Sequence, residues 1–360
     1  MLRYFKRQMM EKGVIFWASL LLIIGVLMLF SASKGVLVKE SIFLKQCLWI
    51  IIATIAGAFI KKIDYRDFQR IAPPLYFIII FLLVAVLFSW SSGGASRWIR
   101  LGVFNLQPSE FAKLITVITL AAYLAEKDIR RFPVLLVSLI IIGIPFLLVL
   151  KQPNLGTAFI FIVVFFAIIY QAGATKGQMI SLFLIGIFSS PFMWFIMKPY
   201  QRERILTFIN PMRDPLGKGY NLIQSIITIG SGGFFGKGFL RGTQTKLAFL
   251  PEYHTDFIFC AFAEEFGFIG VVVLLGIYFM FFKSIAEVIY YTRERFAKLL
   301  ATGILVIFIA HVVINTGMTM GLFPVVGIPL PFISYGGSSL MVSLISVVLV
   351  ANIKENTIMF

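Results

Sequence analysis

The sequence predicts an all-α integral membrane protein with ten transmembrane helices, both termini cytoplasmic and a large extracytoplasmic loop between helices 7 and 8. Of its 360 residues, 59% are hydrophobic and only 13% are charged, whereas a soluble domain carries about 25% charged residues. Several apolar runs reach the ~20 residues that a helix needs to cross a bilayer. No separate soluble domain stands out, so residues 1–360 are predicted to form a single polytopic membrane domain.

Ten apolar runs support this prediction. The first follows a basic start, as a signal peptide does, but it is longer than a signal core and nine more runs follow it. It is therefore interpreted as a retained signal anchor. The predicted spans cover residues 14–33, 43–60, 74–90, 109–125, 133–150, 154–171, 179–197, 256–282, 298–322 and 333–351.

Basic residues determine the predicted orientation, because cytoplasmic loops are enriched in lysine and arginine. The amino terminus and the second, fourth and eighth loops are basic, and most of the loops that alternate with them are poorer in charge. Both termini are therefore expected in the cytoplasm. This pattern accounts for much of the net charge of +16, so nucleic-acid binding is not needed to explain it. The residues concerned are Arg3, Lys6, Arg7, Lys12, Lys61, Lys62, Arg66, Arg70, Lys127, Arg130, Arg131, Lys283, Arg293 and Arg295.

The long loop 198–255 is the exception, because it is predicted outside and is nevertheless basic. Orientation rules act weakly on long loops, so the excess points to an anionic ligand or to lipid headgroups. Residues 220–229 are predicted to form an amphipathic helix at the membrane interface. The glycines of 231–238 are suited to bringing backbone amides near a phosphate. The loop's basic residues are Lys198, Arg202, Arg204, Arg213, Lys218, Lys237, Arg241 and Lys246.

Asp256 is the most informative residue, since it lies where this loop enters the eighth apolar run. A carboxylate inside lipid costs about 2.5–3.5 kcal/mol, so chains rarely carry one there without a partner or a function. Glu264 and Glu265 follow about two helical turns later. The three acids mark this region as the predicted working site.

Two further polar motifs precede it. Glu110 and Lys113 are three residues apart at the start of the fourth run and can pair on one helix face. The pair is either a structural salt bridge or an anion contact made by Lys113 and held by Glu110. Trp98 is either an interfacial belt residue or a stacking platform for a sugar, with Arg97 or Arg100 on a phosphate.

Two junctions between runs are also polar. The short turn 151–156 contains Gln152 and Asn154, which are either ordinary turn residues or ligands. Segment 327–339 combines prolines, glycines and serines, including Ser338. Irregular backbone at membrane depth is tolerated where it lines a cavity, so this segment fits the wall of a substrate groove. Close helix packing through small residues is the alternative.

Taken together, these motifs resemble the SEDS family (shape, elongation, division and sporulation) along essentially the whole chain. The last block and Met318–Gly327 are more similar to the rod-shape (RodA) branch than to the division (FtsW) branch. The blocks are Ser96-Arg-Trp98, Gln107-Pro-Ser-Glu-Phe-Ala-Lys113, Gln152-Pro-Asn-Leu-Gly-Thr157, the segment from Ile229 to Phe257, and Pro329-Leu-Pro-Phe-Ile-Ser-Tyr-Gly-Gly-Ser-Ser339.

The resemblance implies a bacterial peptidoglycan glycosyltransferase for cell-wall elongation that polymerises lipid II, a disaccharide-pentapeptide on a polyprenyl diphosphate. It places the enzyme in the cytoplasmic membrane with its site facing outward. It also implies a class B penicillin-binding protein and the elongation machinery as partners. The family's essential aspartate maps onto Asp256. Many relatives have aspartate where this chain has Asn154, which puts any role for a negative charge there in doubt.

This chemistry is consistent with one prominent carboxylate among basic residues. We expect Asp256 to act as general base on the acceptor sugar and cations to stabilise the departing diphosphate. A divalent cation (Mg²⁺ or Mn²⁺) could assist, but no cluster of ligands fixes a site for it. A flippase for lipid-linked precursors is the main alternative, and a noncatalytic scaffold is a third. The predicted substrate-binding residues are Trp98, Glu110, Lys113, Gln152, Arg204, Arg241, Lys246 and Ser338.

Overall fold

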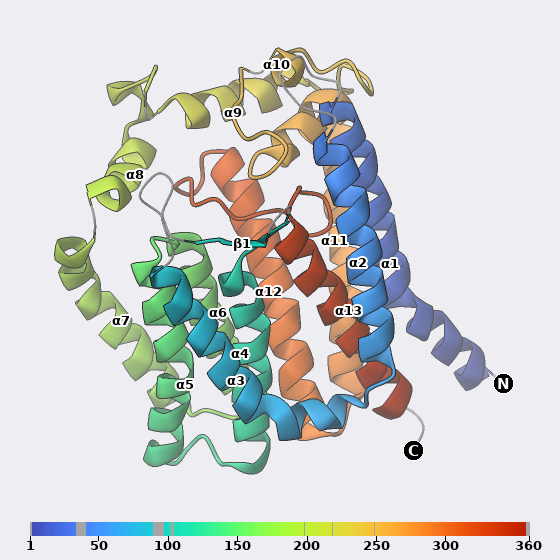
Figure 1. Cartoon of the computed structure of the whole chain (residues 1–360), viewed down its shortest axis with the longest axis vertical. Helices are drawn as coiled ribbons and strands as arrows, with labels where there is room; N and C mark the ends of the chain where they lie inside the picture. The colour runs from blue at the N-terminus through green and yellow to red at the C-terminus, as the bar shows by residue number, and fades with distance from the viewer. Residues whose placement is uncertain are drawn as a thin grey trace. The chain divides into compact units, whose positions relative to one another are not determined.

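The computed structural model describes residues 2–33, 41–88, 97–101, 104–197, 199–217, 219–247 and 249–357. These residues form helices and one antiparallel hairpin in which Ile99 pairs with Leu106. The all-α prediction is thus confirmed apart from the hairpin, whose strands have only three residues each. The elements (Figure 1) are α1 Leu2–Ser33, α2 Ser41–Lys61, α3 Tyr65–Leu87, β1 Ile99–Leu101, β2 Phe104–Leu106, α4 Pro108–Glu126, α5 Phe132–Lys151, α6 Leu155–Gln171, α7 Lys176–Ile196, α8 Pro199–Ile209, η1 Pro211–Arg213, α9 Tyr220–Ser231, α10 Thr243–Lys246, α11 Ile258–Tyr291, α12 Arg295–Thr319 and α13 Gly337–Thr357.

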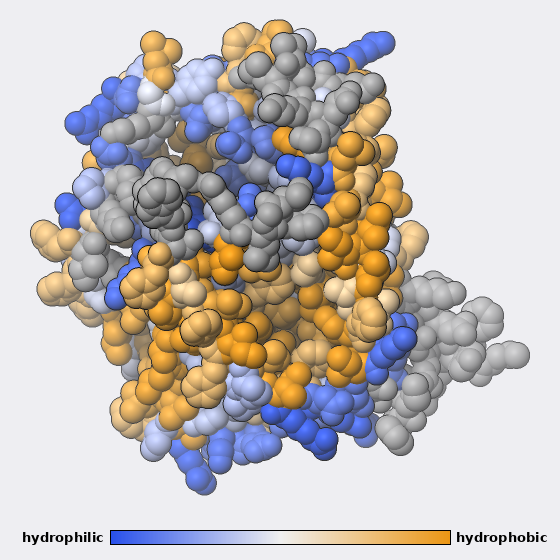
Figure 2. All heavy atoms as spheres, in the orientation of Figure 1, coloured by the Kyte–Doolittle hydropathy of each residue, from blue (hydrophilic) through white to orange (hydrophobic). Residues whose placement is uncertain are grey.

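Within the described ranges, eight helices are long and apolar enough to cross a membrane: α1 to α5 and α11 to α13. They correspond to eight of the predicted spans. The other two predicted spans correspond to α6, a shorter apolar helix of 17 residues, and to α7, and the ten-helix topology stays a prediction. Hydrophobic side chains cover the flanks of the helices in Figure 2, as expected for surfaces that face lipid.

Two compact units divide the chain. One comprises Met1–Lys61, Glu203–Ile285 and Phe308–Ala351, and the other Lys62–Arg202, Ala286–Ile307 and Asn352–Phe360. We call them the Asp256 unit and the Lys113 unit after the predicted site residue that each contains. The predicted single membrane domain stays a prediction.

In the Lys113 unit, α3, α4, α5 and α6 pack against one another, and α4 is the most deeply buried of them. Tyr76 on α3 donates a hydrogen bond to the carbonyl oxygen of Ile141 on α5 at 2.8 Å. Arg295 at the start of α12 donates to the carbonyl oxygens of Lys127 and Ala172 at 3.0 and 3.3 Å. The first contact joins the middles of α3 and α5, and those of Arg295 hold helix ends together.

In the Asp256 unit, small residues allow close packing around segment 328–337. A Cβ on Gly25 of α1 would lie 2.2 Å from the Phe332 carbonyl oxygen, and one on Gly337 would lie 1.9 Å from the Trp49 ring of α2. The alternative interpretation of the glycines in segment 327–339, close packing, therefore holds at Gly337.

Helix α9 confirms the predicted amphipathic helix. On its polar side Ser225 and Thr228 are buried, whereas Ile226 on its apolar side is 47% exposed. The reason is a hydrogen bond of 2.9 Å from the Ser225 hydroxyl to the carbonyl oxygen of Thr319 at the end of α12. The polar side of α9 thus faces protein, which leaves apolar side chains for the membrane interface.

Helix α11 is broken where the sequence predicts one continuous span. Gly267 has φ 65° and ψ −165°, so it divides α11 into two helical pieces, the first of which is Ile258–Phe266. The loop before α10 docks at the break: the amides of Phe268 and Ile269 donate to the carbonyl oxygens of Gly233 and Phe234 at 3.0 and 3.2 Å. The backbone groups beside the break therefore have hydrogen-bond partners outside their own helix.

Gly267→Ala should destabilise the protein strongly. The backbone conformation at Gly267 is one that only glycine adopts readily, and other residues lose about 1–3 kcal/mol there. A Cβ would also lie 2.2 Å from the amide nitrogen of Gly236. We expect a clearly lower midpoint of thermal unfolding in detergent.

Gly276→Ala is the matched control on the same helix, because a Cβ there meets nothing within 4 Å and alanine favours helix. Equal midpoints for the two variants would contradict the proposed importance of the break.

Candidate functional site around Asp256

Asp256 lies in a turn, half-buried, two residues before α11 begins at Ile258. Segment 254–256 is held through its backbone, because three consecutive carbonyl oxygens accept hydrogen bonds from residues distant in the sequence. The Asn315 side chain donates to Asp256 at 2.9 Å, and the Ser334 hydroxyl donates to Thr255 at 2.6 Å. The third bond, 2.9 Å long, runs from the Tyr335 amide to His254.

The groups that hold Asp256 are themselves fixed. Asn315 on α12 also donates to the Ile328 carbonyl oxygen at 2.7 Å. Ser334 also accepts a hydrogen bond of 2.8 Å from the Leu330 amide. Segment 328–335 and α12 together therefore form a backbone clamp on 254–256, which restricts where the Asp256 carboxylate can lie.

Gly327 lies beside that carboxylate. A Cβ at this position would lie 3.1 Å from the Asp256 Oδ2 atom, and φ is +67°. Both the backbone conformation and the space favour glycine. Sequence reasoning placed Gly327 in a polar segment but did not assign it this contact.

His254 is a neutral neighbour of Asp256 at physiological pH. Burial lowers the pKa of the His254 imidazole from its ordinary value of 6.5, and the nearby Glu252 carboxylate opposes that shift. Desolvation disfavours the charged imidazolium. Histidine 254 therefore adds no fixed positive charge next to Asp256.

The predicted basic ligands of the Asp256 unit differ in accessibility. Arg241 is exposed, Arg204 on α8 is half-buried, and Lys246 donates a hydrogen bond to the Leu240 carbonyl oxygen. Ser338 is buried in the first turn of α13. Lys198 and Lys218, also counted in the basic loop, lie outside the described residues.

Glu264 and Glu265, predicted as part of the working site, are both buried at the end of the first piece of α11. Glu265 accepts a hydrogen bond from the Ser31 hydroxyl of α1. Glu264 accepts bonds from Lys237 and from the amides of α10. Two amides of the glycine-rich segment, those of Lys237 and Gly238, donate to the Glu264 and Glu265 carbonyl oxygens. They therefore fix the loop, whereas the sequence interpretation assigned such amides to a phosphate.

In the Lys113 unit, the predicted pair on α4 is formed. The Lys113 ammonium and the Glu110 carboxylate are 2.8 Å apart, and their side chains are 2% and 5% exposed. Burying a charge is tolerated when it is paired. The pairing is thus confirmed, and the anion contact predicted for Lys113 stays a prediction.

The turn between α5 and α6 is also built from predicted residues. Gln152 is buried and donates to the Leu83 carbonyl oxygen at 2.9 Å. Asn154 caps α6 by accepting from the Thr157 amide at 3.3 Å, a role that asparagine fills well. Arg97 donates to the Gln152 carbonyl oxygen at 3.0 Å, so it holds this turn rather than standing free for a phosphate.

Trp98, the residue after Arg97, is 45% exposed. Ser96 and the side chain of Arg100 lie outside the described residues.

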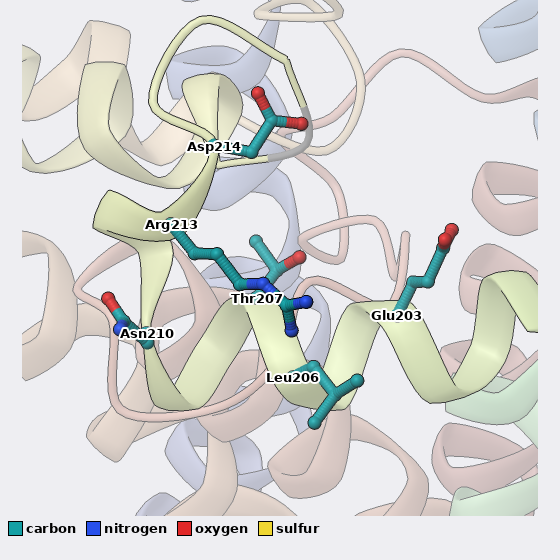
Figure 3. A pocket seen from close by; sticks show the side chains of 6 residues that line it. All are labelled: Glu203, Leu206, Thr207, Asn210, Arg213 and Asp214. Atoms are coloured by element: carbon teal, nitrogen blue, oxygen red, sulfur yellow. The ribbon is translucent and has the colours of Figure 1, made fainter.

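A pocket of about 260 Å³ lies in the long loop, between α8 and η1. In Figure 3 the Arg213 side chain extends beside Thr207 and Leu206. None of the predicted site residues lines this pocket, although Arg204 lies on α8, which forms one of its walls. Its lining residues are Glu203, Leu206, Thr207, Asn210, Arg213 and Asp214.

Among the residues that the structure describes, no three His, Cys, Asp or Glu side chains are grouped as metal ligands. Residues 254–256 contribute one carboxylate and one imidazole, and the Asn154 amide serves as a helix cap.

Comparison with known proteins identifies the family. The family of cell cycle proteins that comprises FtsW, RodA and SpoVE matches residues 11–358. The chain belongs to this family. Members named after both branches are similar to it, so the comparisons do not separate the FtsW branch from the RodA branch.

Three curated members of the family illustrate this. The probable peptidoglycan glycosyltransferase FtsW of Trichlorobacter lovleyi is 39% identical, covering 92% of this chain and 89% of the relative. The peptidoglycan glycosyltransferase MrdB of Escherichia coli is 41% identical, covering 78% and 77%. The peptidoglycan glycosyltransferase RodA of Treponema pallidum is 33% identical, covering 92% and 94%.

Two solved structures share the fold. A chain of a peptidoglycan synthase complex, described for its coordination of polymerization and crosslinking, superposes with a TM-score of 0.83 at 30% identity and covers 97% of this chain and 98% of its own. The rod shape determining protein RodA of Thermus thermophilus gives a TM-score of 0.73 at 26% identity, with 96% and 97% covered. The family's fold therefore extends over nearly the whole chain.

Asn315→Leu should destabilise the backbone clamp. The substitution introduces an apolar side chain of similar size and leaves the carbonyl oxygens of Asp256 and Ile328 without the Asn315 donor. A buried polar group without a partner costs about 1–3 kcal/mol. We expect a lower unfolding midpoint, measured by thermal unfolding in detergent.

Thr316→Val is the control at the adjacent position, because among the described residues the Thr316 hydroxyl bonds only to carbonyl oxygens of its own helix. A midpoint for Asn315→Leu equal to that of the control would show that the clamp contributes nothing to stability.

Proposed function

We propose that this protein is a peptidoglycan glycosyltransferase of the RodA type, which polymerises lipid II at the outer face of the cytoplasmic membrane during cell elongation. Its membership of a family with named peptidoglycan glycosyltransferases supports the activity. The observation that carries the assignment of the site is the backbone clamp on 254–256, which fixes Asp256. Met318–Gly327 and the Tyr335 form of the last motif favour the RodA branch.

In the proposed reaction, the Asp256 carboxylate takes the proton of the acceptor sugar hydroxyl. The hydroxyl oxygen forms a bond to the anomeric carbon of the donor as the bond between that carbon and the diphosphate oxygen breaks, with inversion. The polyprenyl diphosphate leaves with the bonding electrons, and the proton on Asp256 passes to solvent. Diphosphate is a good leaving group, so this step needs cations more than a second carboxylic acid.

The predicted ligands divide into groups that fit parts of this substrate. Arg204, Arg241 and Lys246 carry positive charge for the diphosphate in the Asp256 unit. Lys113, held by Glu110 at 2.8 Å, is the predicted cationic ligand from the Lys113 unit. The remaining proposed contacts are polar or aromatic: Trp98 for a sugar face, and Gln152 and Ser338 for hydroxyl or amide groups. A divalent cation bound with the diphosphate would add further charge stabilisation.

The proposal includes a topology and a partner. Ten spans with both termini in the cytoplasm place loop 198–255 and Asp256 outside. The similarity to a chain of a peptidoglycan synthase complex that couples polymerization and crosslinking supports a class B penicillin-binding protein as the transpeptidase partner.

Asp256→Asn should abolish polymerisation while the protein stays folded. Loss of a general base lowers turnover by about 10²–10⁴-fold. The measurement uses purified protein, with and without a cognate class B penicillin-binding protein, labelled lipid II in detergent, and gel separation of the glycan products. Glu252→Gln is the matched control, because this carboxylate lies four residues earlier and is 66% exposed.

A folded Asp256→Asn protein that polymerises at the wild-type rate would refute the general-base role. Wild-type protein that makes no polymer, even with the partner and Mg²⁺ or Mn²⁺, would favour the flippase alternative, which a lipid II translocation assay in vesicles then tests.

A further inference from the structure

The Glu264 carboxylate is fully buried and is saturated with hydrogen bonds from the loop that precedes it. Its Oε1 atom accepts from the Lys237 ammonium at 2.7 Å and from the amides of Thr243 and Gln244, each at 2.8 Å. Its Oε2 atom accepts from the Thr245 amide at 3.2 Å and from the Thr245 hydroxyl. A carboxylate with this many donors is a structural anchor and not a free acid or base.

Lys237 completes the anchor from the other end of the loop. Besides Glu264, its ammonium donates to the hydroxyls of Ser231 and Thr243 at 2.9 and 2.7 Å. All three donor positions of a lysine ammonium are thus used. Lys237 is therefore committed to the loop and is not available to a substrate.

The loop is also fixed to the break in α11. The amides of Lys237 and Gly238 donate to the carbonyl oxygens of Glu264 and Glu265 at 3.0 and 2.9 Å. A Cβ on Gly236 would lie 2.2 Å from the Glu265 carbonyl oxygen, so only glycine permits this approach. Segment 237–245 is accordingly held at both ends, by its backbone at the break and by the Glu264 side chain.

Arg241 lies between these two attachments. Its amide donates to the Gly238 carbonyl oxygen at 3.0 Å, which fixes its backbone. Its guanidinium is exposed and makes no hydrogen bond or ion pair within the described part of the chain. The next residue is Gly242, where a Cβ would lie 2.9 Å from the Glu264 Oε2 atom. The Glu264 carboxylate thus lies close to the residue that follows Arg241.

We infer that Glu264 is a positioning residue: it anchors loop 237–246 so that Arg241 is presented to the diphosphate of the lipid-linked donor. This inference rests on the proposed function. A guanidinium can form two parallel hydrogen bonds to phosphate oxygens, which requires a defined orientation. The rigid loop supplies that orientation, and Glu264 takes no part in proton transfer.

Steady-state polymerisation over a range of lipid II concentrations tests the inference with wild type, Glu264→Gln, Arg241→Ala and the double variant. The amide of glutamine places an NH₂ group against backbone donors in either orientation, so the anchor is lost. We expect each single variant to raise KM for lipid II about tenfold through loss of a hydrogen bond to a charged group. The value of kcat should change little, because Arg204 and Lys246 remain to stabilise the departing diphosphate. The double variant should be no worse than Arg241→Ala, because both act through one contact.

Gly242→Ala is a second variant, which disturbs the anchor without changing any charge and keeps the inference testable if Glu264→Gln does not fold. Size-exclusion chromatography and unfolding midpoints establish folding. Gly276→Ala on α11 is the control substitution of the same kind. Gly242→Ala should show the same rise in KM, which Gly276→Ala should not.

Three results would overturn the inference. Glu264→Gln could lose kcat while its KM stays unchanged, or the KM of the double variant could rise by the product of the two single-variant increases. The third result is a folded Gly242→Ala protein with the KM of the wild type. A KM effect that appears only when anionic phospholipid is added would assign Arg241 to membrane headgroups and also overturn it. Failure of the proposed function is distinguishable, because the wild type itself would then make no polymer.

Discussion

Backbone groups that a helix break leaves unpaired need other partners, and the two helical pieces of α11 find them in the loop that precedes α10. The glycines of 232–238 let that loop approach the break at Gly267, and four hydrogen bonds join the two segments. The same contact places Glu264 where it can bind α10 and Lys237. One constraint, satisfaction of backbone polarity in an apolar surrounding, therefore explains the glycines, the buried carboxylate and the course of the basic loop.

Asp256 follows the same logic at the start of the helix. A turn before a helix offers several unpaired carbonyl oxygens, and here Asn315, Ser334 and the Tyr335 amide take those of residues 254–256. The carboxylate is thus positioned through its backbone while its side chain stays half-buried beside Gly327. Such positioning is the preorganisation that the proposed general base needs, because a fixed group loses little entropy when substrate arrives.

Sequence reasoning predicted the features that depend on local pattern. Apolar runs identified the helices, and the three-residue spacing identified the Glu110–Lys113 pair. The role assigned to Asp256, an acid at an apolar boundary, stays a prediction. It missed what depends on distant contacts. The break at Gly267 lies inside an uninterrupted apolar run. The buried face of α9 is set by Thr319, a residue 94 positions away from Ser225. In the sequence Glu264 resembles Asp256, because both are acids in or beside an apolar run. The hydrogen bonds donated to the Glu264 carboxylate show that it anchors the loop.

The role proposed for Asp256 is in chemistry and not in binding. The most direct measurement compares the affinity of wild-type protein and of folded Asp256→Asn for labelled lipid II, alongside turnover by each. We expect affinities that agree within a few-fold, together with a fall in turnover of about 10²-fold or more. An affinity that falls as far as turnover would contradict the account, because Asp256 would then be a ligand of the substrate and the base would have to be another group.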